Sequence, residues 1–126
     1  MDISSHSDFA EQVFAAVASH GRWKKRLVAA IEAGDSEWTP EEVRDCHQCR
    51  FGHWLDSVPD GFQDDMFVEV FKLHERFHEA AADVLALALS GDKAAAAEAM
   101  AVGSDYARAS TKLITVLAKW HASPPS

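Results

Sequence analysis

Apolar residues recur along this chain at steps of three and four, which is the spacing of one face of an α-helix. No run alternates apolar and polar residues for long enough to indicate a strand. The first helix is predicted over residues 8–33, with Asp8 and Glu11 as a capping box and Gly34 as its stop. Its apolar seam consists of Phe9, Val13, Val17, His20, Lys24, Leu27 and Ile31.

A second, short helix is predicted from the sequence TPEEV. Thr39 is suited to cap it, Pro40 to its first position, and Glu42 to complete a capping box. We expect this helix to run towards Cys49 and to be broken or bent at Gly52, since glycine destabilises a helix interior.

Two more helices follow a turn predicted at residues 59–61, where the sequence is PDG. The third is predicted over residues 62–89 and the fourth over residues 92–121. One face of the third consists of Phe67, Phe71, His74, His78, Ala81, Leu85 and Ala88. The seam of the fourth consists of Ala96, Met100, Gly103, Ala107, Ser110, Ile114 and Leu117. The small residues in that seam would let another helix approach closely.

These elements predict an all-α fold, an antiparallel four-helix bundle with three long helices and one short helix. A chain of 126 residues is most simply one domain and is long enough to bury a core without disulfides. We expect residues 1–126 to form this domain, with an ordered core over residues 8–121 and a short disordered tail ending in SPPS.

Charge excludes several classes of partner. The formal net charge of −8 argues against nucleic acid and against anionic lipid, because both require a basic surface. No apolar stretch approaches the roughly 20 residues that span a bilayer, and the N-terminus has no apolar core of a signal peptide. We therefore expect a cytoplasmic protein, in which a metal site or reactive thiol is more plausible than a disulfide.

Histidines occupy the apolar seams of two predicted helices. His74 and His78 are four residues apart, so both imidazoles lie on one face of the third helix. A pair of hydrogen-bonded core histidines would explain them equally well. His20 favours the metal hypothesis, because it brings a third imidazole to the core from the first helix.

Cys49 offers a thiolate, so one cysteine and three histidines form an N₃S set suited to tetrahedral zinc. The predicted ligands are His20, Cys49, His74 and His78. Cys46 and Cys49 could instead be a redox dithiol, but that motif normally follows a strand. A four-cysteine zinc site would need a second pair, so we interpret Cys46 as a small buried residue. The other histidines are predicted to lie on the surface: His6, His47, His53 and His121.

The residues that follow Cys49 indicate how its side chain reaches the core. Gly52 would permit a tight turn, and the large apolar pair Trp54 and Leu55 would anchor that turn to the bundle. We expect this packing to direct Cys49 inward.

Three motifs together resemble the chemoreceptor zinc-binding domain, a bacterial family often called CZB. The motifs are His20-x-x-Trp23-Lys24-x-x-Leu27, Cys49-x-Phe51-Gly52-x-Trp54-Leu55 and His74-x-x-x-His78. The resemblance extends over about residues 8–120. It implies a four-helix bundle that holds one zinc through the same three histidines and one cysteine.

The resemblance also implies a function. Members regulate chemoreceptors or diguanylate cyclases, many are homodimers, and their signals are zinc or oxidants such as hypochlorous acid. The zinc-bound cysteine is then the reactive thiol. Two features depart from the family: His53 stands where a basic residue is common, and Cys46 is not a family ligand. Met1 and the natural-looking tail favour a free-standing member.

The sequence therefore predicts a non-enzymatic zinc-binding sensory domain. Two alternatives stay open, a thiol oxidoreductase that uses Cys46 and Cys49, and a structural helical adaptor with core histidines. A di-iron carboxylate site is disfavoured, because it needs two Glu-x-x-His pairs and only Glu75-x-x-His78 is present.

Overall fold

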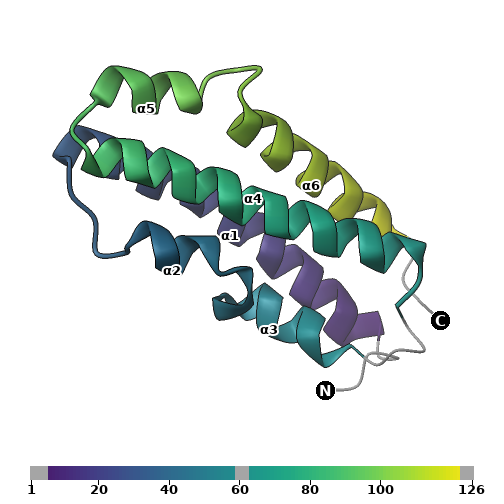
Figure 1. Cartoon of the computed structure of the whole chain (residues 1–126). Helices are drawn as coiled ribbons and strands as arrows, with labels where there is room; N and C mark the ends of the chain where they lie inside the picture. Colours follow the sequence, from purple (N-terminus) through teal and green to yellow (C-terminus); the bar gives the residue numbers. More distant parts are fainter. Residues whose placement is uncertain (1–5, 59–62, 123–126) are drawn as a thin grey trace.

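The computed structural model describes residues 6–58 and 63–122, and every regular element in those ranges is helical (Figure 1). The elements are α1 (His6–Ala33), α2 (Pro40–Arg44), the 3₁₀ helix η1 (Cys46–Gln48), α3 (Arg50–Ser57), α4 (Asp65–Leu89), α5 (Lys93–Ala99) and α6 (Asp105–Ala122). The all-α prediction is confirmed.

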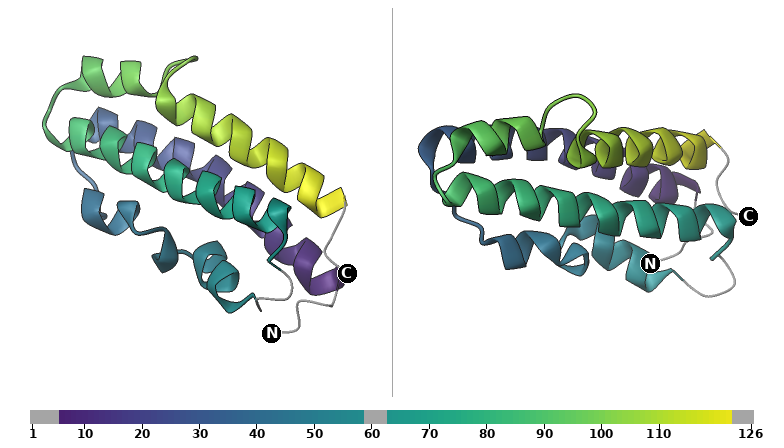
Figure 2. Two further views of the ribbon diagram at one scale, coloured as in Figure 1. Left: turned by 45° about the vertical axis from the view of Figure 1, so that its right-hand side comes forward. Right: turned by 45° about the horizontal axis from the view of Figure 1, so that its top comes forward.

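The elements form four rows. The two long helices, α1 and α4, each form one row, α2, η1 and α3 follow one another along a third, and α5 and α6 form the fourth (Figure 2). The chain reverses its direction from each row to the next (Figure 1). None of the helices in the described part of the chain is long and apolar enough to cross a membrane.

The second row begins as predicted but is not one helix. The capping box is present: the Thr39 amide donates to Glu42 Oε1 at 3.0 Å, and the Glu42 amide donates to Thr39 Oγ1 at 3.2 Å. The helix then ends at Arg44, because Asp45 adopts extended backbone, and the chain is extended again at Cys49. These two extended residues divide the row into α2, η1 and α3.

Gly52 does not break a helix, so that prediction was wrong. It is buried inside α3, whose first turn is capped by the Cys49 sulfur accepting from the Gly52 amide. A Cβ at Gly52 would overlap the Cys46 carbonyl oxygen and lie 2.8 Å from its carbon. Gly52 therefore permits close contact between α3 and η1 rather than a turn. The predicted anchors Trp54 and Leu55 are buried, as expected.

The fourth predicted helix is interrupted as well. It ends at Ala99 and resumes at Asp105, and Gly103 between them has a φ of 88°, which favours glycine. The interruption shifts the buried face, so the predicted seam was wrong in α6 at every position except Leu117. Gly103 is exposed and the other seam residues from 100 to 114 are only half-buried. The buried residues of α6 are Tyr106, Ala109, Leu113, Val116, Leu117 and Trp120.

Two predicted helix starts also need correction. The first helix is already formed at His6, so Asp8 lies inside it and does not cap it. The third predicted helix, α4, begins at Asp65, and Asp64 caps it by accepting from the Phe67 amide at 2.9 Å. The predicted turn at residues 59–61, position 62 and the tail at residues 123–126 lie outside the described residues.

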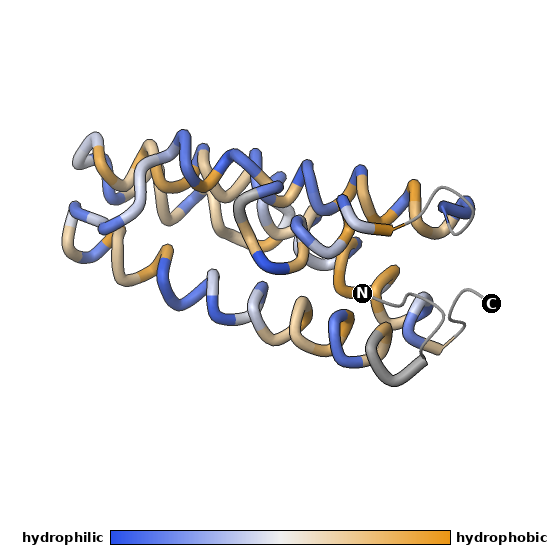
Figure 3. Tube along the Cα trace, turned by 90° about the horizontal axis from the view of Figure 1, so that it is seen from below, coloured by the Kyte–Doolittle hydropathy of each residue, from blue (hydrophilic) through white to orange (hydrophobic). Residues whose placement is uncertain are grey.

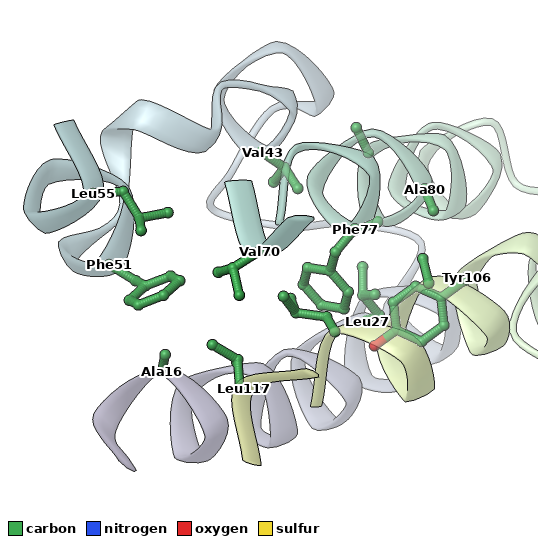
Figure 4. Packing of buried hydrophobic residues seen from close by; sticks show 14 of the residues in the cluster. Ala16, Leu27, Val43, Phe51, Leu55, Val70, Phe77, Ala80, Tyr106 and Leu117 are labelled. Carbon is green, nitrogen blue, oxygen red and sulfur yellow. The ribbon is translucent and has the colours of Figure 1, made fainter. Parts of the chain in front are cut away.

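The core lies between the four rows, where side chains from α1, α3, α4 and α6 meet (Figure 4). Along the helices, hydrophobic and hydrophilic residues each recur every few positions, in keeping with one buried and one exposed face (Figure 3). The buried face of α4 is wider than its predicted seam, since Val70, Phe77 and Val84 are also buried. Both long helices are therefore held on several sides.

Candidate metal centre

Three histidines meet in the core. His20 comes from α1, and His74 and His78 come from adjacent turns of α4. All three side chains are buried, and one nitrogen atom from each forms a group whose members all lie within 4.8 Å of one another. His74 Nε2 and His78 Nε2 are 3.0 Å apart. The structure thus brings together the three histidines that the two seams predicted.

Main-chain carbonyls orient two of these imidazoles. His20 Nδ1 lies 2.5 Å from the Ala16 carbonyl oxygen, and His78 Nδ1 lies 2.8 Å from the Val43 carbonyl oxygen. A carbonyl oxygen can only accept, so Nδ1 donates in both rings and each Nε2 keeps its lone pair. This backbone support of the outer nitrogen is typical of metal-binding histidines.

His20 Nε2 is buried and has no hydrogen-bond partner among the described residues. An unpaired buried ring nitrogen is costly, and in most cores such a group is satisfied. His20 belongs to the group in which one ring nitrogen from each of three buried histidines lies within 4.8 Å of the others. Several lone pairs gathered in this way could all donate to one metal cation.

Burial keeps the three imidazoles neutral. Burial is the main cause that lowers the pKa of His20 from 6.5 to about 4, against the opposing hydrogen bond to Ala16, and the pKa of His74 to about 2, where neighbouring histidines contribute. The pKa of His78 is also lowered, again chiefly by burial, although the hydrogen bond to Val43 opposes the shift. Neutral imidazole is the form that binds metals.

Cys49 stands beside this group. Its Sγ lies 3.3 Å from His74 Nε2, and the side chain is only partly buried. The thiol donates to the Cys46 carbonyl at 3.5 Å and accepts from the Gly52 amide at 3.3 Å. Burial raises the pKa of Cys49, although hydrogen bonds from backbone amides oppose the shift. Cys49 is not a member of the compact three-histidine group.

Cys46 is buried, as predicted, at 5% exposure. Burial raises its pKa to about 11, with further contributions from the nearby charges of Glu75 and other groups. The thiol is therefore protonated at neutral pH and is a poor nucleophile. Both cysteines are free in this structure.

The predicted surface histidines lie away from the centre where they can be described. His47 is exposed and forms an ion pair with Asp56, with Nδ1 2.7 Å from Oδ2. His53 and His121 are exposed, and the side chain of His6 lies outside the described residues.

The family model described as the chemoreceptor zinc-binding domain matches residues 20–85, more than half of the chain. The chain belongs to this family. The match is shorter than the extent predicted from the motifs, but it begins at His20 and includes Cys49 and both histidines of α4. No curated protein and no solved structure matches the chain.

Zinc is therefore the metal that this chemoreceptor zinc-binding domain is built to hold, and the residues fit it. Neutral imidazole nitrogens are preferred zinc ligands, and His20, His74 and His78 present three of them to one space. The orphaned His20 Nε2 gains a partner when a cation occupies that space.

Sequence reasoning missed the groups that support the ligands. The carbonyls of Ala16 and Val43 gave no signal, because every residue carries one. Phe77 packs against the His20 ring, with ring centroids 4.5 Å apart, and it was outside the predicted seam. A wider predicted apolar face for this helix would have included Phe77.

Acid is expected to destabilise the metal-free protein. An unfolded histidine titrates near 6.5 and the folded ones titrate lower, so below pH 6.5 the unfolded state binds more protons. Stability is unaffected above that pH and falls as pH drops towards 4. At pH 5 the loss is roughly 2 kcal/mol for each histidine that stays neutral. Urea unfolding of chelator-treated protein at pH 7.5, 6 and 5 measures this, and a flat profile would contradict it.

Proposed function

We propose that the chain is a zinc-binding regulatory domain of bacterial signal transduction, in which His20, Cys49, His74 and His78 hold one zinc ion. The observation that carries this proposal is the buried group of three histidines, in which one ring nitrogen of each residue lies within 4.8 Å of the others. A set of lone pairs gathered among buried side chains fits a cation.

Cys49 is the best candidate for the fourth ligand. Its sulfur is 3.3 Å from His74 Nε2, and the Gly52 amide already donates to it. Bound zinc would supply the positive charge that holds this sulfur as a thiolate at neutral pH. Four protein ligands leave no position for a substrate, so we propose a regulatory rather than an enzymatic site.

The four rows of helices would then act as the antiparallel four-helix bundle expected of the family. The ligands come from α1, from the junction of η1 with α3, and from α4. Loss of the Cys49 ligand would release that junction, which consists of short elements, while α1 and α4 keep their mutual packing. This gives the domain a segment that can change position.

The exposure of its side chain favours Cys49 as the residue that reacts with an oxidant. Its side chain is partly exposed, whereas His20, His74 and His78 are 1–3% exposed. Hypochlorite would transfer its oxygen to the thiolate, giving a sulfenate and chloride, and a sulfenate is a weaker zinc ligand. We propose an oxidant of this kind, or zinc itself, as the signal.

The proposed partners rest on family membership alone. A chemoreceptor or a diguanylate cyclase is the proposed output, and a symmetric homodimer is the proposed assembly. Both stay predictions, as does a cytoplasmic location.

The structure offers less support to the two competing functions. A structural adaptor would have no need to bring one ring nitrogen from each of three buried histidines within 4.8 Å of one another. A dithiol oxidoreductase would need Cys46 to be reactive, yet burial raises its pKa to about 11.

Cys49→Ala is expected to lower zinc affinity by about 100-fold or more, because even residues that only support a ligand contribute roughly 10–100-fold. Cys46→Ala should bind zinc like the wild type. Zinc per chain is measured after purification without added metal, and affinity by competition with a chromogenic chelator. Wild-type affinity in Cys49→Ala would remove Cys49 from the ligand set.

Cys46→Ala also tests the redox role. Hypochlorite should release zinc from wild-type protein and from Cys46→Ala at similar rates, since Cys49 is the residue oxidised. If Cys46→Ala abolishes release, the two cysteines act together as a dithiol instead.

A further inference from the structure

A small pocket of about 100 Å³ leads from the surface to Cys49. It lies between α1 and the start of α3, and its lining also includes His20 and His78 from the proposed zinc centre. Its size suits a molecule of a few heavy atoms. Gln12, which is 9% exposed, and Ser19 add polar groups to its wall.

The charged side chains around this pocket have one sign. Arg22 from α1 and Arg50 from α3 line it, and none of its lining residues is a carboxylate. Both arginines are exposed on a protein whose formal net charge is −8. Glu11 is near Arg50 but only loosely paired, at 4.0 Å with both side chains at least 64% exposed. The mouth is therefore a positive region on an acidic molecule.

A second pocket is also lined by Cys49 and Trp23, and its charge is different. It has a volume of about 290 Å³ and is lined by two carboxylates, Glu42 and Asp45. Its only arginine, Arg26, rests over the rings of Trp23 and Trp38 with its guanidinium carbon 5.1 and 4.9 Å from the ring centroids. An anion gains nothing by approaching on this side.

We propose that the pocket between Arg22 and Arg50 is the entrance through which small anionic oxidants reach Cys49. This inference rests on the proposed function, in which Cys49 is the reactive thiolate, and it adds a selection by charge. An oxidant of the form X–O⁻ enters, the Cys49 thiolate attacks its oxygen, and the X–O bond breaks. The sulfur loses two electrons and becomes a sulfenate, while X leaves with the electron pair as X⁻. The charges of Arg22 and Arg50 do not attract a neutral oxidant such as hydrogen peroxide.

Charge-matched alkylating probes isolate this selection. Iodoacetate is an anion and iodoacetamide is neutral, and each transfers its carbon to the thiolate and releases iodide. The rate of alkylation of Cys49 in the zinc-loaded protein is followed by mass spectrometry of peptides, which also separates Cys49 from Cys46. The measured quantity is the iodoacetate rate divided by the iodoacetamide rate.

Arg22→Gln and Arg50→Gln should each lower this ratio roughly threefold, the factor expected from one charge at about 6 Å in water. Arg22→Lys should restore most of it, and Glu11→Gln should raise it by releasing Arg50. Lys112→Gln on α6, a matched charge change remote from this pocket, should leave it unchanged. The effect should fade at about 0.5 M salt, because exposed charges are then screened.

The outcomes separate this inference from the function on which it rests. If Cys49 reacts but its ratio is the same in Arg22→Gln, Arg50→Gln and Lys112→Gln, the entrance is wrong and the zinc-bound thiol stands. If neither probe modifies Cys49, the entrance and the proposed role of Cys49 as the reactive thiolate both fail, and the zinc affinity of Cys49→Ala still decides whether Cys49 is a ligand.

Discussion

Gly52→Ala should cost the fold about 3 kcal/mol or more and abolish tight zinc binding. A Cβ at this position would overlap the Cys46 carbonyl oxygen, lie 2.8 Å from the Cys46 carbonyl carbon and lie 3.0 Å from the Cα of His47. All three atoms belong to the backbone, so no side-chain rotation relieves the clash. The junction of η1 and α3 must move, and Cys49 moves with it. Urea unfolding and zinc titration measure the two effects.

Gly21→Ala is the matched control. Gly21 lies in α1 next to His20, and a Cβ there would meet nothing within 4 Å. Alanine is the better helix former, so this variant should be more stable by up to about 1 kcal/mol and should bind zinc normally. If both substitutions have the same small effect, the close contact at Gly52 does not hold the centre together.

Relative to the wild type, His20→Leu should be more stable without zinc and less stable with zinc. Without metal, the variant should be more stable than the wild type by about 1–2 kcal/mol, because it replaces a buried, unpaired nitrogen with an apolar group of similar size. Leucine can also pack against Phe77, which now contacts the His20 ring. The Ala16 carbonyl loses only its added contact with the ring.

With excess zinc the order should invert. The wild type gains the free energy of binding, about 2.7 kcal/mol at a zinc concentration 100 times the Kd, while the variant has lost a ligand. Thermal unfolding with chelator and with zinc gives both comparisons. His53→Leu, at an exposed position, should shift neither curve by more than about 0.5 kcal/mol. A metal-free His20→Leu protein less stable than the wild type would show that the imidazole contributes to the core without zinc.

The helices and the three histidines could be predicted because their signals are periodic. Phe9, Val13 and Leu27 mark one face of α1, and His20 falls on that face at the same spacing. On α4 the same argument placed His74 and His78 in the core. Burial of an amphipathic face determines such positions, so a single sequence is sufficient.

The interruptions could not be predicted, because they depend on how neighbouring short elements pack against one another. Asp45 and Cys49 become extended where α2 gives way to η1 and α3, although nothing local forbids a helix there. Gly52 was read as a helix breaker because glycine is compatible with both a turn and a close contact. Only the position of Cys46 relative to α3 decides between the two.

The main-chain acceptors of the histidine rings affect which amino-acid substitutions this centre tolerates. His20 is oriented by the carbonyl of Ala16 and His78 by the carbonyl of Val43, and both acceptors are independent of side-chain identity. Residues 16 and 43 can therefore be exchanged for others of similar size without altering how the rings are held. The residues that specify the centre are the three histidines, the proposed ligand Cys49 and Gly52, and the remaining support of the rings comes from main-chain carbonyls. Such a centre can persist while most of the surrounding sequence drifts.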